Sequence, residues 1–252
     1  MFKILPVLIL TTIGFASAGL STSDLTFNAN GVSIHYILKG KGEPVVLIHG
    51  LHSSARMNWQ MPGIIDDLSR NYQVIALDLP GHGESDRPSR EEAYGLEMVE
   101  VVVRLLDHLK IKKAHIIGYS LGGMIALKLA ARHPQRVRTV VVGGMGWMRE
   151  GSFLQKVWER TPEREGSRTP AECVRSIGRL ALTREELSGI RIPLIVLVGD
   201  RDPVKRLYVA SLQEARRDWT VIEIKDAGHL NCIVRAQFKE EIRRWLASHP
   251  HV

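Results

Sequence analysis

The sequence predicts an α/β fold in which a mostly parallel central sheet of about eight strands is flanked by helices and carries a short helical cap insertion. Short runs rich in β-branched residues alternate with longer amphipathic runs, which is typical of strand–helix–strand crossover units. Several of the short runs are continuously apolar, as expected of strands buried on both faces of a sheet. The chain of 252 residues, 44% of them hydrophobic, is long enough for one such domain with a large core.

The strands and helices are expected in the following order. The first two strands, at 26–27 and 32–38, flank Asn30-Gly31, a pair that favours a tight hairpin turn and an antiparallel start to the sheet. The later strands are expected at residues 45–48, 73–77, 114–117, 137–142, 194–198 and 220–224. Helices are expected near residues 60–69, 96–109, 121–132, 204–217 and 232–248.

The alternation of strands and helices stops in residues 145–189, which include a charged stretch. An insertion between two core strands is a candidate lid over a site. A surface crossover with no part in substrate binding is the alternative. The expected organisation is a single domain over 19–252, with its core at 24–144 and 190–252 and the cap or lid at 145–189.

The N-terminus has the layout of a secretory signal peptide. Met1-Phe2-Lys3 carries one positive charge, residues 4–15 are apolar, and Ala16-Ser17-Ala18 supplies the small residues of a cleavage site. We expect residues 1–18 to be removed after Ala18, so that the mature protein is secreted or periplasmic and has no stable membrane span. A retained anchor is the alternative, but the apolar stretch is shorter than the roughly 20 residues that cross a bilayer.

The charge balance of the chain is modestly basic. The formal charge is +7, and the loss of Lys3 with the signal peptide leaves +6 on the side chains. The basic residues are scattered and do not form a strip interleaved with aromatic residues, so nucleic-acid binding is not expected.

Cys173 and Cys232 are the only cysteines. Outside the cytosol they could form a disulfide, and two buried thiols are the alternative. The sequence does not decide between these, because a disulfide requires Cα atoms within about 7 Å of each other.

Ser120 lies in the middle of the segment Gly-Tyr-Ser-Leu-Gly at 118–122, between an expected strand at 114–117 and an expected helix at 121–132. The flanking glycines permit a sharp turn that pushes the hydroxyl out of the sheet, and the helix N-terminus directs its amides to the same place. The five-residue pattern alone can arise by chance in a chain of this length. The expected strand before it and the expected helix after it make it a strong indication of a nucleophile turn. Ser120 is therefore the candidate nucleophile.

A serine nucleophile needs a base within hydrogen-bond reach, and the base needs a carboxylate that holds its tautomer. Of the ten histidines, His229 is favoured because it follows the last expected strand, at the same edge of the sheet as Ser120. Asp200 and Asp202 follow the strand at 194–198 and reach that edge too. Asp202 is favoured as the acid because it directly precedes the next helix and can turn back toward His229, whereas Asp200 is interpreted as a turn residue that binds local amides.

Acyl transfer also needs two N–H donors for the developing oxyanion. Leu121, directly after the serine, offers one backbone amide, and Leu51, in the turn after the strand at 45–48, offers the other. No metal site and no cofactor are expected.

Loops near these turns contain residues that could border a substrate, and the apolar ones among them favour an apolar acyl group or ring. Ordinary packing in the core or the cap is the alternative for the apolar residues. The candidate substrate-binding residues are His52, Trp59, Tyr119, Met145 and Trp147, with Met148 nearby.

Taken together, these motifs resemble the α/β-hydrolase fold family, in particular serine esterase-like and lipase-like members with a small cap. The resemblance covers roughly residues 24–252 apart from the insertion, and the chain order Ser120, Asp202, His229 matches the nucleophile, acid and histidine of that family. In the family, the segment matching 78–85 is a structural turn without a catalytic role. The motifs that carry the resemblance are His49-Gly50, Asp-Leu-Pro-Gly-His-Gly-Glu-Ser at 78–85, the glycine-flanked serine at 118–123, Gly-Asp-Arg-Asp-Pro at 199–203 and Gly228-His229.

The serine at this turn makes epoxide opening and dehalogenation unexpected, because relatives with those activities use an aspartate there. The expected reaction is hydrolysis of a small-molecule or polymeric carboxylic ester through a tetrahedral oxyanion and an acyl-enzyme. The alternatives are carbon–carbon bond hydrolysis of a diketone, lactone opening, amide cleavage, peracid formation, and a hydrolase-fold protein that binds a partner without turnover. The short insertion favours an open site that admits bulky or polymeric esters.

Overall fold

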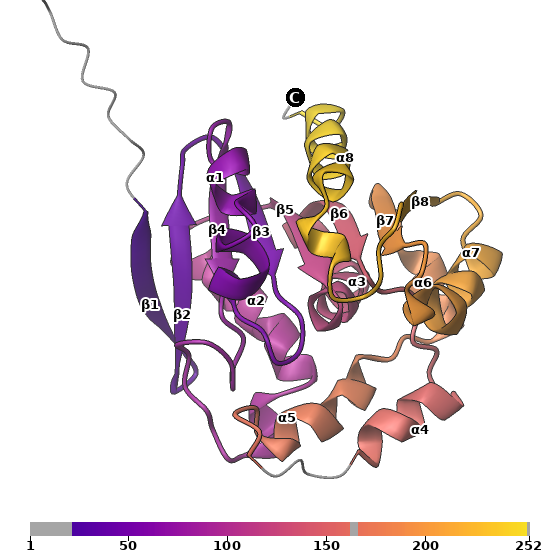
Figure 1. Ribbon diagram of the computed structural model, residues 1–252. Helices are drawn as coiled ribbons and strands as arrows, with labels where there is room; N and C mark the ends of the chain where they lie inside the picture. Colours follow the sequence, from indigo (N-terminus) through magenta and orange to yellow (C-terminus); the bar gives the residue numbers. More distant parts are fainter. Residues whose placement is uncertain (1–21, 162–165, 251–252) are drawn as a thin grey trace, which may run out of the picture.

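Eight strands form one mixed sheet at the centre of the molecule (Figure 1). The structure is a computed structural model that describes residues 22–161 and 166–250. The spatial order of the strands is β1-β2-β4-β3-β5-β6-β7-β8. The pairs β1–β2 and β2–β4 are antiparallel, and the remaining neighbouring pairs are parallel. This confirms the predicted fold class. The strands are β1 (Ser23–Ala29), β2 (Val32–Lys39), β3 (Glu43–Ile48), β4 (Tyr72–Leu77), β5 (Ala114–Tyr119), β6 (Val137–Gly143), β7 (Leu194–Gly199) and β8 (Thr220–Ile224).

A two-residue turn joins β1 to β2. Asn30 and Gly31 have φ values of 54° and 82°, as a type I′ hairpin turn requires, and Ala29 pairs with Val32 across the hairpin. The Gly31 amide donates a hydrogen bond of 2.7 Å to the Asn28 side chain. The antiparallel start of the sheet therefore follows from the predicted turn.

Every helix predicted for the core is present, although three of them begin with a different geometry. A π-helical turn, Arg56–Gln60, precedes α1, and Gly63, at a φ of 77°, separates the two. Another π-helical turn, Lys205–Val209, continues into α7, and a 3-10 turn, Cys232–Val234, precedes α8. The core helices are α1 (Ile64–Leu68), α2 (Leu96–His108), α3 (Leu121–Arg132), α7 (Ala210–Ala215) and α8 (Ala236–Ala247).

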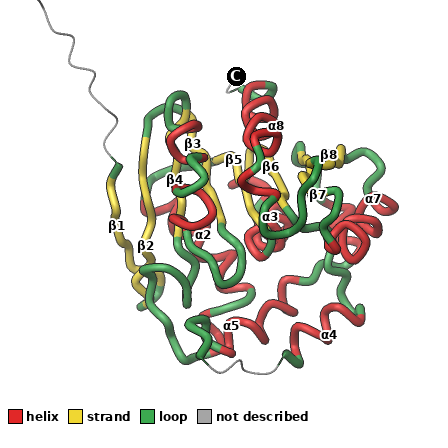
Figure 2. The backbone as a smooth tube through the Cα atoms, in the orientation of Figure 1, coloured by secondary structure: helices red, strands yellow, loops and turns green. Residues whose placement is uncertain are grey.

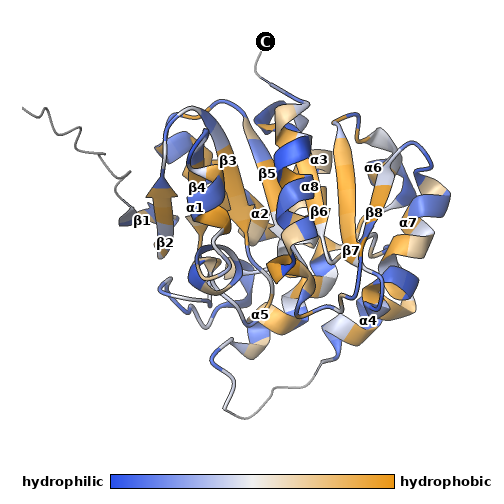
Figure 3. Cartoon of the chain, turned by 45° about the horizontal axis from the view of Figure 1, so that its top comes forward, coloured by the Kyte–Doolittle hydropathy of each residue, from blue (hydrophilic) through white to orange (hydrophobic). Residues whose placement is uncertain are grey.

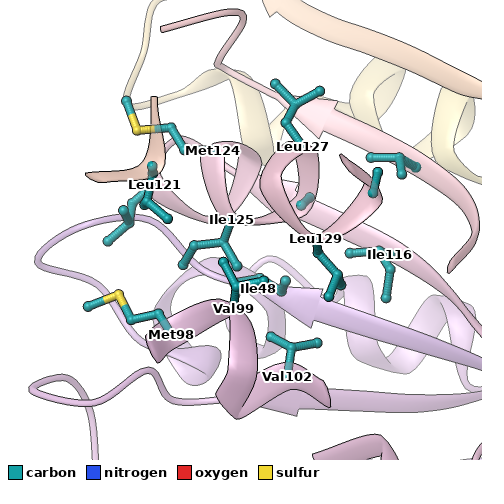
Figure 4. Packing of buried hydrophobic residues seen from close by; sticks show 14 of the residues in the cluster. Ile48, Met98, Val99, Val102, Ile116, Leu121, Met124, Ile125, Leu127 and Leu129 are labelled. Atoms are coloured by element: carbon teal, nitrogen blue, oxygen red, sulfur yellow. The ribbon is translucent and has the colours of Figure 1, made fainter. Parts of the chain in front are cut away.

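Helices cover both faces of the sheet because side chains alternate in direction along each strand. In β3, Val46 and Ile48 belong to the apolar cluster that contains α2 and α3, whereas Val45 and Leu47 belong to the cluster that contains α1 and α8. Figure 4 shows the first layer, with Ile48 among side chains of α2 and α3. The central strands are accordingly hydrophobic along most of their length (Figure 3).

The described residues of 145–189 form three short α-helices and a 3-10 turn, Ile177–Leu180, joined mainly by loops (Figure 2). The α-helices are α4 (Phe153–Glu159), α5 (Ala171–Ser176) and α6 (Arg184–Gly189), and α4 and α5 lie beyond one end of the sheet (Figure 1). The segment is tied to the core where the Lys128 ammonium of α3 donates hydrogen bonds of 2.8 and 2.9 Å to the Glu186 carboxylate. Its role as a cap or lid stays a prediction.

Both cysteines are buried free thiols. Burial raises the pKa of Cys173 and of Cys232 to about 12. Of the two alternatives for these residues, the structure therefore has two buried thiols and not a disulfide.

The predicted signal peptide at 1–18 lies outside the described residues, and export of the protein stays a prediction. In residues 22–161 and 166–250, no helix is long and apolar enough to cross a bilayer.

Candidate active site

Ser120 occupies the sharp turn between β5 and α3. Its backbone φ of 53° and ψ of −113° lie in a region that residues with a Cβ rarely adopt, so the turn is strained. A Cβ on Gly118 would lie 2.0 Å from the Gly122 carbonyl oxygen, and a Cβ on Gly122 would lie 2.0 Å from the Ile48 carbonyl oxygen. Both positions therefore require glycine, and the close packing holds the serine at the carboxyl end of β5.

The structure brings Ser120, His229 and Asp202 together from three separate segments of the chain. The Ser120 Oγ lies 3.0 Å from His229 Nε2, and His229 Nδ1 lies 2.8 Å from an Asp202 carboxylate oxygen. The other carboxylate oxygen accepts a hydrogen bond of 2.9 Å from the Val204 amide. With Nδ1–H donating to the buried carboxylate, Nε2 keeps its lone pair for the serine hydroxyl, which is the arrangement of a nucleophile, a general base and an orienting acid.

The loop that carries His229 is fastened from two sides. The Asp200 carboxylate accepts hydrogen bonds of 3.1 and 3.0 Å from the amides of Asp226 and Ala227, and these amides hold the pKa of Asp200 below its usual value. The Tyr119 hydroxyl donates a hydrogen bond of 2.5 Å to the His229 carbonyl, and burial raises the pKa of that tyrosine. Asp200 therefore binds backbone amides, as predicted. The amides with the larger effect on its pKa belong to the distant histidine loop, and the Arg201 amide of its own turn has a smaller one.

The predicted oxyanion donors lie on either side of Ser120. Within the described residues, neither the Leu51 amide nor the Leu121 amide donates a hydrogen bond to another group of the protein. The turn that carries Leu51 runs close to the nucleophile, because a Cβ on Gly50 would lie 3.2 Å from the Ser120 Cβ. Two free donors beside the serine suit an oxyanion, and their role stays a prediction.

A buried histidine shapes the turn before Leu51. His49 Nε2 accepts a hydrogen bond of 3.0 Å from the Leu79 amide, so Nδ1 carries the proton and donates to the Gly50 carbonyl at 2.7 Å. Burial lowers the pKa of His49, which keeps the ring neutral. The segment 78–85 thus supports the turn structurally, since the Asp78 carboxylate also accepts hydrogen bonds from the amides of Ala55 and Glu84.

An apolar cavity of about 220 Å³ opens beside the triad. Met145, a predicted substrate-binding residue, contributes to its wall, as do both predicted oxyanion residues. The insertion contributes Trp158 and Ile177, and the Trp158 indole donates a hydrogen bond of 3.1 Å to the Tyr208 hydroxyl. The complete lining is Leu51, Ser120, Leu121, Met124, Met145, Trp158, Ile177, Val204, Tyr208 and His229.

Four predicted substrate-binding residues lie elsewhere. Trp59 is fully buried in the core, in the apolar cluster on the face covered by α1. Trp147 is buried and donates a hydrogen bond of 2.9 Å to the Leu182 carbonyl, and Tyr119 supports the histidine loop from below the cavity. His52, at a φ of 58°, points to a different cavity, where its ring lies 2.9 Å from the Thr169 hydroxyl.

That second cavity has a volume of about 510 Å³ and a wall of mixed polar and apolar surface. Its lining includes Arg87, Arg168 and His82, whose pKa is lowered to about 3 by burial. Ser120, Asp202 and His229 do not line this second cavity. Nowhere in the described part of the chain do three or more His, Cys, Asp or Glu side chains gather closely enough to hold a metal ion.

Five cavity residues were not predicted from the sequence: Met124, Trp158, Ile177, Val204 and Tyr208. A signal existed for Val204 and Tyr208, because the helix predicted after Asp202 had to begin beside the triad. For Trp158 and Ile177 the only signal was that the insertion, as a cap, would turn its apolar residues toward the site.

A family model for the alpha/beta hydrolase fold matches residues 43–179, which include the nucleophile turn and the turn before Leu51. The chain belongs to the α/β-hydrolase fold family. Within it, the protein is similar to 2-hydroxymuconate semialdehyde hydrolase of Pseudomonas sp. strain CF600, with 36% identity over 195 residues, 73% of this chain and 65% of that protein. It is also similar to the dihydrolipoyllysine-residue acetyltransferase component of the acetoin cleaving system of Pseudomonas putida, with 41% identity over 45% of this chain and 30% of that protein. The chain thus spans between about a third and two thirds of the length of these relatives.

Solved structures give the same family. The enol-lactonase of Burkholderia xenovorans LB400 aligns with a TM-score of 0.73 and 25% identity, over 88% of this α/β-hydrolase and all of that chain. A carboxylesterase structure from Nitrososphaera gargenis aligns with a TM-score of 0.70 over 90% of this chain and 98% of that chain, and at 20% identity it shows the shared fold alone.

Proposed function

We propose that this α/β-hydrolase cleaves carboxylic esters with an apolar acyl group. The observation that carries the proposal is the hydrogen-bonded series Ser120 Oγ, His229 Nε2 and Asp202 at the wall of an apolar cavity. His229 takes the proton of Ser120 as the oxygen attacks the ester carbonyl, and the amides of Leu51 and Leu121 hold the oxyanion. The proton passes to the departing alkoxide, and water activated by His229 then hydrolyses the acyl-enzyme.

The cavity favours an acyl group of moderate size. Its volume of about 220 Å³ holds roughly seven water-sized groups at about 30 Å³ each, which corresponds to an acyl chain of roughly six to eight carbons. Its wall contains no arginine or lysine among the described residues, so a carboxylate in this cavity would lack a cationic partner. A neutral apolar acyl chain meets no such cost.

Carbon–carbon bond hydrolysis is the second candidate, and the similarity to 2-hydroxymuconate semialdehyde hydrolase is the observation that favours it. The similarity to an enol-lactonase likewise makes lactone hydrolysis a candidate reaction to test. Both reactions use a serine nucleophile with the same triad. They are less favoured because the apolar cavity offers no charged side chain to hold a polar ring or acid.

A fluorophosphonate probe tests the nucleophile first. The wild-type protein should be labelled and Ser120→Ala should not, while circular dichroism verifies that both are folded. A folded wild type that resists the probe would refute the catalytic role of Ser120.

A panel of p-nitrophenyl esters, a diketone and a lactone then tests the substrate class. Ester hydrolysis should rise from acetate to medium chains and fall for long ones. Faster turnover of the diketone or the lactone than of every ester would replace ester hydrolysis with one of the other candidates.

A further inference from the structure

Three exposed apolar residues, each on a different element, are direct sequence neighbours of residues that line the cavity. Leu230, 91% exposed, directly follows His229; Leu207, 42% exposed, precedes Tyr208 on the π-helical turn; and Val157, 45% exposed, precedes Trp158 on α4. Single exposed apolar residues are ordinary on protein surfaces. Here each of the three is adjacent in sequence to a cavity-lining residue, and Phe153 lies one helical turn before Val157 on α4. We call these four residues, Phe153, Val157, Leu207 and Leu230, the rim.

Helix α4 carries one broad apolar stripe, because residues 153, 154, 157 and 158 lie on the same side of a helix. Leu154 and Trp158, four residues apart, face inward, where Leu154 packs against the core and Trp158 lines the cavity. Phe153 and Val157, also four residues apart, are exposed, Phe153 to 77%. A surface helix normally turns a single apolar stripe toward the core. The edge of the α4 stripe formed by Phe153 and Val157 is therefore left uncovered by the described residues, at the end of the sheet where the loop before α8 also lies (Figure 1).

Among the described residues, the charges beside Val157 and Leu207 are mainly positive. Lys156 and Arg160, beside Val157, and Arg206, beside Leu207, are exposed and have no carboxylate partner in the described part of the chain. The carboxylate of Glu223 is already paired with Lys205 at 2.7 Å. Helix α4 itself carries one acidic side chain, that of Glu159, against these three cations.

We propose that the rim docks on the surface of an anionic lipid aggregate and presents the cavity to esters within it. Apolar side chains that enter the lipid boundary, combined with basic ones that meet anionic headgroups, are the features of interfacial binding. The inference rests on the proposed ester hydrolysis, because esters with apolar acyl chains of the size that fits the cavity leave water for micelles and droplets. The rim would bring the cavity to them.

Co-sedimentation with vesicles tests the docking. Wild type should bind vesicles that contain phosphatidylglycerol and bind poorly to phosphatidylcholine vesicles, with the binding weakened by salt. The double variant Phe153→Ser/Val157→Ser should lose about tenfold or more of its affinity for the anionic vesicles, since two inserted side chains are removed. The matched control Leu25→Ser removes an exposed apolar side chain from the edge strand β1 and should bind like wild type.

Hydrolysis of monomeric p-nitrophenyl butyrate separates this inference from the proposed function. The double variant should cleave the monomeric ester at the wild-type rate and lose activity on emulsified tributyrin. Vesicle binding that is absent in wild type, or equal in the double variant, overturns the inference. So does a wild-type dimer in analytical ultracentrifugation that the double variant converts to monomer, because a second copy would then cover the rim. If wild type binds vesicles but cleaves no ester, the proposed function fails and the docking stands.

Discussion

Substituting Gly122 by alanine tests whether the nucleophile turn depends on contact with the oxyanion turn. Gly122 lies in the first turn of α3, where alanine is the better helix former by about 1 kcal/mol. Helix propensity alone therefore predicts a more stable protein. The packing predicts the opposite, because the new Cβ would lie 2.0 Å from the Ile48 carbonyl oxygen.

The size of the effect follows from that distance. Ordinary contact begins at 3.4 Å, so β3 and α3 must separate by about 1.4 Å at this point. Overpacking of this kind costs about 1–3 kcal/mol, which exceeds the gain in propensity for most of that range. The chain that must move leads from Ile48 to Leu51, and a misplacement of about 1 Å in a catalytic group lowers kcat about 100-fold.

The assay is the hydrolysis of p-nitrophenyl butyrate together with thermal unfolding. Gly122→Ala should lower kcat about 100-fold and the Tm by a few degrees. The matched control is Gly189→Ala at the end of α6, where a Cβ meets no atom within 4 Å, and it should keep wild-type activity and stability. Wild-type kcat in Gly122→Ala would refute the claim that this contact positions the site.

Three further predictions follow from the contacts around the site. Asp200→Ala should lower kcat about tenfold with little change in KM, since the His229 loop loses two hydrogen bonds. Asp200→Asn should recover part of the loss, because its amide oxygen still accepts one of these hydrogen bonds. Equal kcat in wild type and both variants would exclude a positioning role for Asp200. Trp158→Ala should move the preferred ester to longer acyl chains in the p-nitrophenyl series, since it removes one wall of the cavity, and an unchanged profile would place the acyl group elsewhere. Cys173 and Cys232 should resist iodoacetamide until the protein unfolds. Because burial raises both pKa values to about 12 from an ordinary value of 9.0, their contribution to stability is complete below pH 9 and is lost as the pH rises toward 12, which urea unfolding across that range measures.

The sequence was sufficient to predict the fold and to bring the three triad residues to one edge of the sheet. The reason is topological: Ser120, Asp202 and His229 each follow a parallel strand, and the carboxyl ends of parallel strands meet at one edge. Polar residues at such ends have few alternative partners. The choice of Asp202 over Asp200 agrees with the contacts, since of these two aspartates it is Asp202 that bonds the His229 ring.

The cavity lining was harder to predict, because the sequence does not show whether an apolar side chain packs in the core or faces a cavity. Trp59 and Trp147 are large apolar residues near the predicted site. In the structure, Trp59 packs in the core and Trp147 donates a hydrogen bond to the Leu182 carbonyl. Trp158, in the insertion, is the tryptophan that reaches the cavity. Which of three tryptophans faces a substrate depends on loop conformation, and neither spacing nor hydrophobicity encodes that conformation locally.

The contacts that set the triad geometry lie mostly outside the cavity. On one side of Ser120, glycine packing against β3 fixes the strained turn. On the other, Asp200 and Tyr119 hold the backbone of the loop that carries His229. The serine-to-histidine distance of 3.0 Å is thus determined by two independent supports, neither of which touches the space where an acyl group would lie. It follows that substitutions in the cavity wall should change which ester is preferred, whereas substitutions in the supports should slow every ester alike.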